Sequence, residues 1–118
     1  MKIHYSTSES KEYFLAEGCH ILELCNSDEH SELSIARARL EPQQETELHS
    51  LISTAERYII QHGCGIATID KQEFTVNVND VLVIQPNISQ KISNTGDEDL
   101  IFLVICTPRF QPDNYQTL

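Results

Sequence analysis

Short apolar runs rich in Val, Ile, Leu, Phe and Thr recur along the chain, with polar turn residues between them. Such runs are typical of strands in an all-β domain, and no long stretch repeats its apolar residues with the period of a helix. About ten short strands in one chain predict a closed barrel or a double-sheet jelly roll. The predicted strands cover 13–16, 19–25, 33–40, 48–52, 56–61, 65–69, 72–77, 81–84, 90–93 and 100–106.

The segments between the predicted strands carry residues that favour turns. Asp70 and Lys71 separate two predicted strands as the central residues of a tight hairpin would. Asn79 and Asn87 mark two further bends, since asparagine tolerates a positive φ better than most residues. Pro108 and Pro112 end any strand in which they lie, so the tail is predicted to follow an extended path over the surface.

The size of the chain indicates one domain. It has 118 residues, of which 40% are hydrophobic, and this suffices for a single buried core. We expect one domain over 1–118, with N-terminal strands in 1–32, a core barrel in 33–110 and a C-terminal tail in 111–118. Eighteen acidic residues against eight basic ones give a net charge of −10, which repels phosphate backbones and argues against nucleic-acid binding.

The N-terminal sequence and the cysteines both favour a cytoplasmic protein. The opening residues MKIHY lack the apolar stretch of a secretion signal, and no apolar run is long enough to cross a membrane. The four cysteines, Cys19, Cys25, Cys64 and Cys106, form no CxxC pair. We expect reduced thiols that pack as small hydrophobic groups, with a disulfide or zinc role as the alternative.

Three polar residues in predicted strands form the main candidate site. Strand side chains alternate between faces, so His49 shares a face with Leu51, and Glu56 shares one with Tyr58. If these faces and that of Gln90 line one barrel interior, an imidazole, a carboxylate and an amide converge there. A His and a Glu on neighbouring strands can share a divalent ion, and Gln90 can add an oxygen or remain a neutral pocket group.

The spacing of these residues resembles the two sequence motifs of the cupin family. His49, Leu51, Glu56 and Gly63 follow the first motif, in which His-x-His is followed by Glu and then by Gly. The resemblance covers 33–110 and implies a double-stranded β-helix, or jelly-roll barrel, similar to small single-domain bacterial cupins of the sugar-isomerase-like (RmlC-like) kind. The second motif reads Gly-Asp, then Pro-x-Gly-x-x-His-x-x-x-Asn, and its counterparts here are Asn79, Asp80, Pro86, Asn87, Gln90 and Asn94.

The chain departs from the ligand set that this resemblance implies. Cupins that hold a metal typically use two histidines and a glutamate from the first motif and one histidine from the second. Here Leu51 replaces one histidine and Gln90 replaces another. Gln43, Asn79 and Asn87 stand where the family has glycines, and asparagine at the last two positions can preserve the turn.

Two classes of function remain open. In the first, His49, Glu56 and Gln90 hold Zn, Ni, Fe or Mn with water completing the coordination, although with lower affinity than the full ligand set. The chain would then be a metal-dependent enzyme, isomerase-, dioxygenase- or lyase-like, acting on a small polar or anionic molecule such as a sugar or keto acid. In the second, the same three side chains form a hydrogen-bonded cluster in a metal-free binding or sensing module.

Four further residues are candidates for substrate contacts. Tyr58 can donate a proton or orient a substrate oxygen as a catalytic residue, or it can simply pack. Arg37 and Arg39 share one strand face; if that face is interior they attract an anionic substrate, and otherwise they form an exposed or interface-paired arginine ladder. His20 can face the cavity and bind substrate or supply a missing ligand, or be a packing residue.

The resemblance also implies a homodimer. Cupins commonly pair by sheet packing, and a sandwich of short strands has edges that need to be covered. The expected partners are therefore a small-molecule ligand and a second copy of the chain, with neither nucleic acid nor a membrane among them.

Overall fold

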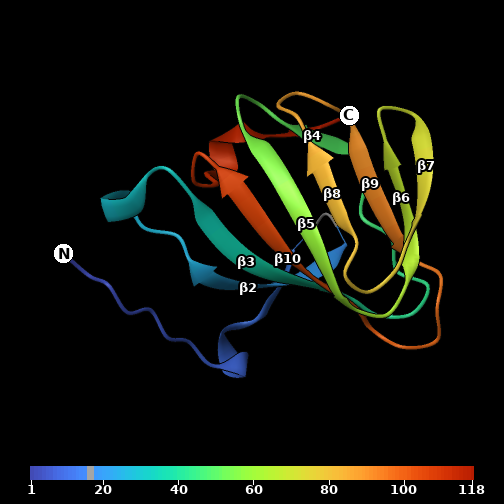
Figure 1. The fold of residues 1–118 in the computed structure, drawn as a ribbon, viewed down its shortest axis with the longest axis horizontal. Helices are drawn as coiled ribbons and strands as arrows, with labels where there is room; N and C mark the ends of the chain where they lie inside the picture. The colour runs from blue at the N-terminus through green and yellow to red at the C-terminus, as the bar shows by residue number, and fades with distance from the viewer. Residues whose placement is uncertain (16–17) are drawn as a thin grey trace.

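The structure is an all-β sandwich of two sheets (Figure 1), seen in a computed structural model that describes residues 1–15 and 18–118. Short 3-10 turns lie at η1 (Glu9–Lys11), η2 (Asp28–His30) and η3 (Pro112–Asn114). The strands are β1 (Tyr13–Leu15), β2 (Cys19–Cys25), β3 (Ser34–Leu40), β4 (His49–Leu51), β5 (Ala55–His62), β6 (Gly65–Ile69), β7 (Gln72–Val76), β8 (Val81–Ile84), β9 (Gln90–Asn94), β10 (Leu100–Thr107) and β11 (Tyr115–Thr117).

Both sheets are antiparallel throughout. One sheet has the strand order β1, β2, β3, β10, β5, β8, and the other has the order β11, β4, β9, β6, β7. From β3 onward the chain crosses from one sheet to the other at each step except the β6–β7 hairpin, as in a jelly roll, and the predicted fold class is confirmed. None of the helical turns among the described residues is long and apolar enough to cross a membrane.

The predicted strands agree with the observed ones to within one or two residues at each end, and the predictions for β2, β6 and β8 have the observed bounds. Position 16, which the first predicted strand included, lies outside the described residues. The prediction for the tail was incomplete, because residues beyond Pro112 form β11 and pair with β4. This strand is short and mostly polar, so no apolar pattern marks it in the sequence.

The turns adopt the conformations that their residues favour. Asp70 (φ 49°) and Lys71 (φ 69°) form the two-residue hairpin between β6 and β7, and both are left-handed as a type I′ turn requires. Gln43, Asn79 and Asn87 also have positive φ, at 70°, 76° and 70°. The chain thus keeps at all three positions the backbone that the family's glycines would favour, and glutamine does so without the local hydrogen bonding that helps asparagine there.

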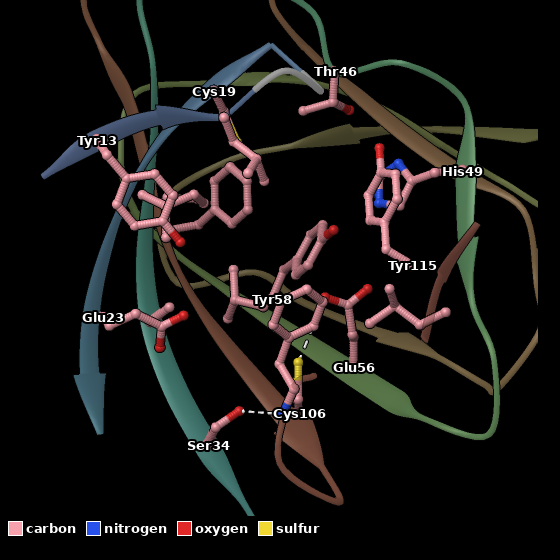
Figure 2. Close-up of a pocket in the computed structure, with 18 residues that line it drawn as sticks. Tyr13, Cys19, Glu23, Ser34, Thr46, His49, Glu56, Tyr58, Cys106 and Tyr115 are labelled. Atoms are coloured by element: carbon pink, nitrogen blue, oxygen red, sulfur yellow. Dashed lines mark hydrogen bonds between the residues drawn. The ribbon is translucent and has the colours of Figure 1, made fainter. Parts of the chain in front are cut away.

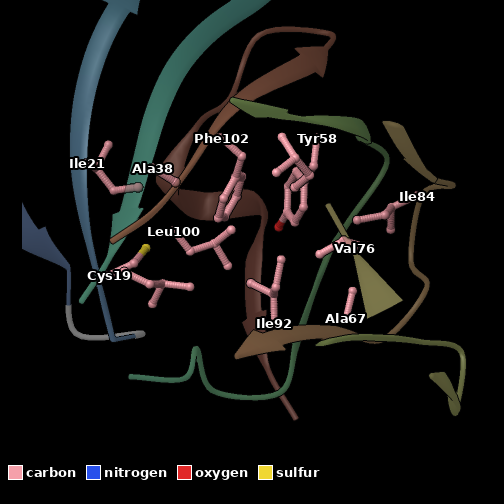
Figure 3. Packing of buried hydrophobic residues seen from close by; sticks show 12 residues of the cluster. Cys19, Ile21, Ala38, Tyr58, Ala67, Val76, Ile84, Ile92, Leu100 and Phe102 are labelled. Atoms are coloured by element: carbon pink, nitrogen blue, oxygen red, sulfur yellow. The ribbon is translucent and has the colours of Figure 1, made fainter. Parts of the chain in front are cut away.

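The core lies between the two sheets (Figure 3). Phe102 on β10, Ile60 on β5 and Ile92 on β9 are at most 2% exposed, and their side chains meet in the middle of the sandwich. Burying one such side chain contributes roughly 1.5–3 kcal/mol. The four cysteines are free thiols, of which Cys19 and Cys106 are buried.

Candidate functional site

A cavity of about 60 Å³ opens between the sheets at the end of the sandwich where β4 and β11 face β2, β3 and β10 (Figure 2). Its wall includes His49 and Leu51 from β4 and Glu56 and Tyr58 from β5. These are the faces that strand alternation predicted to point inward. The cavity therefore brings together three of the candidate side chains, His49, Glu56 and Tyr58.

The three predicted site residues do converge. Gln90 lies opposite His49 in the β4–β9 pairing, and Gln90 Nε2 donates a hydrogen bond to Glu56 Oε1. The Tyr58 hydroxyl donates to Gln90 Oε1, so the amide joins the phenol to the carboxylate. All three are nearly inaccessible, with His49 4%, Glu56 5% and Gln90 2% exposed. Gln90 itself does not line the cavity, and it is joined to the wall by its hydrogen bonds to Glu56 and Tyr58.

The imidazole of His49 is fixed by two contacts. Its Nδ1 lies 2.8 Å from the carbonyl oxygen of Glu47, and because a carbonyl can only accept, Nδ1 is the nitrogen that carries a proton. The ring stacks on Tyr115 of β11, with centroids 4.8 Å apart and the planes 16° from parallel. These contacts set the orientation of the ring at the cavity wall.

A thiol also contacts the carboxylate. Cys106 Sγ lies 3.7 Å from Glu56 Oε2, whereas the hydrogen bond from Gln90 goes to the other oxygen, Oε1. Burial raises the pKa of the Cys106 thiol far above its usual range, and the charge of Glu56 raises it further. Cys106 is thus a neutral hydrogen-bond donor, and Glu56 accepts one hydrogen bond on each oxygen.

The residues present do not match the requirements of a resident metal ion. No group of three or more His, Cys, Asp or Glu side chains within 1–15 and 18–118 is arranged to hold an ion. The amide of Gln90 turns its NH₂ group toward Glu56 and its oxygen toward Tyr58, so it offers no lone pair beside the carboxylate. Leu51, at the position of a family histidine, lines the cavity with a side chain that cannot coordinate a metal.

A second carboxylate lines the cavity, from β2. Glu23 shares its strand face with Cys19 and Ile21, which also line the wall. Burial raises the pKa of Glu23, while hydrogen bonding to Asn26 and the charge of Arg109 act in the opposite direction. Two carboxylates of the six-stranded sheet therefore line the cavity, Glu23 from β2 and Glu56 from β5 (Figure 2).

The structure places Arg37 and Arg39 away from the cavity. Both lie on the opposite face of β3 from the cavity-lining Ala36 and Ala38, so the condition that their face is interior is not met. Arg37 donates to Glu9 and Glu12, and Arg39 donates to Glu12 and Asp99 at 2.7–3.1 Å. The two guanidinium groups lower the pKa of Glu12 to about 2, and they tie the N-terminal segment to the sheet.

His20 also points away from the cavity. Its Nε2 lies 2.9 Å from Glu41 Oε1, and its ring meets that of Phe14 edge-on with centroids 5.0 Å apart. The expectation that His20 faces the cavity is not met. Its contacts with Glu41 and Phe14 are those of a packing residue, which was the alternative. Leu22, which lies on the same face of β2 as His20, is only 3% exposed, so side chains on this outer face are buried too.

Glu23, Cys106 and Tyr115 are among the cavity-wall residues that the sequence analysis did not single out. Glu23 lies on the same strand face as Ile21, and Cys106 lies on the same face as Phe102. The alternation of apolar residues along these strands could therefore have indicated that both point inward. Nothing in the sequence marks Tyr115, which reaches the wall because β11 pairs with β4.

Comparison with known proteins identifies the family. The uncharacterized protein MJ1618 of Methanocaldococcus jannaschii is 29% identical over 110 residues, which are 92% of this chain and 88% of that protein. A predicted oxalate decarboxylase from Thermotoga maritima superposes with a TM-score of 0.80 at 25% identity, over 90% of this chain and 99% of that one. A variant of Streptomyces Pac13, a nucleoside dehydratase, solved with uridine superposes with a TM-score of 0.82 over 100% of this chain and 92% of that one, and at 13% identity it shows the fold alone. Because residues 36–106 match the family model of the cupin domain, the chain belongs to the cupin family.

Proposed function

We propose that the protein binds a small molecule in the cavity between its sheets without using a metal ion. The observation that carries this proposal is the hydrogen-bonded bridge Tyr58–Gln90–Glu56, in which the amide occupies the position of the family's last histidine and both its polar ends are used. A cavity with a mostly apolar wall and a few oriented polar groups is typical of small-molecule sites. Of the two classes that the sequence leaves open, the metal-free one is supported.

Metal content tests this proposal directly. Protein purified without chelator or metal resin is expected to contain only traces of Zn, Ni, Mn and Fe by elemental analysis, and its Tm is expected to stay constant when each ion is supplied. An ion present at about 100 times its Kd would stabilise the fold by about 2.7 kcal/mol and raise Tm by several degrees. One ion per chain that disappears in His49→Ala would contradict the proposal.

A second candidate function is acid–base catalysis on the bound molecule. It is favoured by a carboxylate, an imidazole and a phenol around one cavity, from Glu56, His49 and Tyr58. Glu56 accepts hydrogen bonds from Gln90 and Cys106, so a proton taken from the bound molecule would go to a carboxylate lone pair that these donors do not use. The two candidates differ in what happens to a bound ligand: a binding module releases it unchanged, whereas an enzyme returns a product that mass spectrometry detects.

We also propose that the protein forms a homodimer through the outer face of the six-stranded sheet. Val81 and Val83 on the edge strand β8 are 55% and 52% exposed and lie beside β5 on that face. Apolar side chains on an unpaired strand edge favour association with a second copy. Light scattering is expected to give about twice 13.4 kDa, and the double substitution Val81→Lys with Val83→Lys is expected to return the mass to 13.4 kDa. Wild-type protein with the mass of one chain would contradict the dimer.

A further inference from the structure

The cavity wall collects the aromatic rings of the chain. The whole sequence contains four tyrosines, four phenylalanines and no tryptophan. Three of the four tyrosines and two of the four phenylalanines line this one cavity: Tyr13, Tyr58, Tyr115, Phe102 and Phe110. Such a concentration makes the wall largely aromatic, and the negative electrostatic character of an aromatic ring face attracts positive charge. The Tyr115 ring is stacked on His49, and the Tyr58 ring packs against Phe102.

The charged groups of the wall have one sign. Glu23 and Glu56 are both in the lining, whereas no lysine or arginine is among the described residues that form it. Arg109 acts on Glu23 from a neighbouring hollow, where its Nε donates to Asn26 Oδ1 at 2.7 Å, and it does not enter the cavity. An anionic ligand would therefore meet two carboxylates and the ring faces of the aromatic side chains, with at most His49 to oppose them.

We propose that the ligand of this cavity is a small organic cation of the alkylammonium class. Its charged head would lie beside the carboxylates of Glu23 and Glu56 on the six-stranded sheet, and its carbon atoms would contact the aromatic wall. The net charge of −10 would draw such a cation toward the protein, and it would repel the anions that the arginines were expected to recruit. The inference rests on the proposed small-molecule function, and it adds the chemical class of the ligand.

Three probes with one carbon skeleton separate charge from size: n-butylammonium, butan-1-ol and butanoate. All are small enough to place part of their chain in a cavity of about 60 Å³. Titration into ¹⁵N-labelled protein, followed by chemical shifts of amides around the cavity, gives a Kd for each. We expect n-butylammonium to bind at least about tenfold more tightly than butan-1-ol, in the millimolar range, and butanoate to bind more weakly than either.

Substitution of the acids tests where the selectivity arises. Glu23→Gln is expected to bring the affinity ratio of n-butylammonium to butan-1-ol close to one while butan-1-ol still binds. Glu56→Gln is expected to do the same, although its contacts with Gln90 and Cys106 give it an additional structural role. Glu73→Gln is the matched control, because Glu73 lies on β7 away from the cavity and its loss changes the net charge equally. It is expected to leave the ratio unchanged.

The outcomes distinguish the ligand class from the function on which it rests. If butan-1-ol or butanoate binds as tightly as n-butylammonium, or if the ratio survives both Glu23→Gln and Glu56→Gln, the cationic class is wrong and the binding function stands. If none of the three probes shifts the amides around the cavity, the ligand class and the small-molecule function are overturned together. An equal fall of the ratio in Glu73→Gln would assign the effect to net charge and also overturn the proposed site.

Discussion

Phe102→Ala is expected to lower the free energy of unfolding by about 3–5 kcal/mol. Phe102 is 2% exposed and lies on β10, which pairs with both β3 and β5 in the middle of its sheet. Its ring packs against that of Tyr58 with centroids 4.7 Å apart. The substitution removes buried apolar surface and also enlarges the space between the sheets, so the transfer and cavity costs add.

Urea denaturation of the wild-type protein and the variant measures this difference. Phe74→Ala is a matched control, because Phe74 on the edge strand β7 is 42% exposed and its truncation is expected to cost less than about 1 kcal/mol. Since Phe102 also belongs to the cavity wall, ligand binding should weaken in the same variant. Equal costs for Phe102→Ala and Phe74→Ala would show that β10 is not the centre of the packed core.

The double substitution Leu51→His with Gln90→His is expected to create a metal site at a position where the native ligand set lacks two histidines. Leu51 shares the cavity-facing side of β4 with His49, and Gln90 lies opposite His49 on β9. The variant would present three imidazoles beside the carboxylate of Glu56, which is the ligand set of metal-holding cupins. We expect it to retain about one Zn, Ni or Mn ion per chain and to gain about 3 kcal/mol of stability at saturating metal.

The controls for this gain of metal binding are assayed in the same way, by metal content per chain and by stability with metal present. Leu48→His adds an imidazole to an exposed position outside the cavity wall, and it should bind no ion. Each single substitution should bind more weakly than the pair, because affinity grows with the number of correctly placed ligands. If the pair folds and still takes up no metal, the two strands do not bring these positions close enough to share an ion.

The fold and the centre of the site could be predicted because their signals are local. The apolar runs and their turn residues specify the strands. Alternation showed which residues share a face with His49, Glu56 and Gln90, and the cupin resemblance suggested that these faces line one interior, where the structure brings the three side chains together. Which way the amide of Gln90 points depends on the hydroxyl of Tyr58 and the carboxylate of Glu56, which come from another strand. The sequence therefore located the residues without deciding whether they would bind a metal.

The sequence could not predict which face of β2 and of β3 points into the sandwich, because each strand has partly buried side chains on both of its faces. Leu22 is buried on one face of β2 while Cys19 is buried on the other, so alternation does not say which side is the interior. The outer face of β3 carries Arg37 and Arg39, whose charges are offset by Glu9 and Glu12 of the N-terminal segment. That pairing depends on where the segment lies in space, which no strand pattern encodes.

Removal of the strand β11 would change the cavity itself. Tyr115 pairs with Leu51 and Thr117 pairs with His49, so the last strand is a structural part of the wall. Without β11, the face of the His49 ring that Tyr115 covers would be exposed. The cavity would also lose Tyr115 from its wall, which would widen the route by which ligands exchange with solvent. A chain that ends at Asn114 is therefore expected to release a bound ligand faster than the full sequence does.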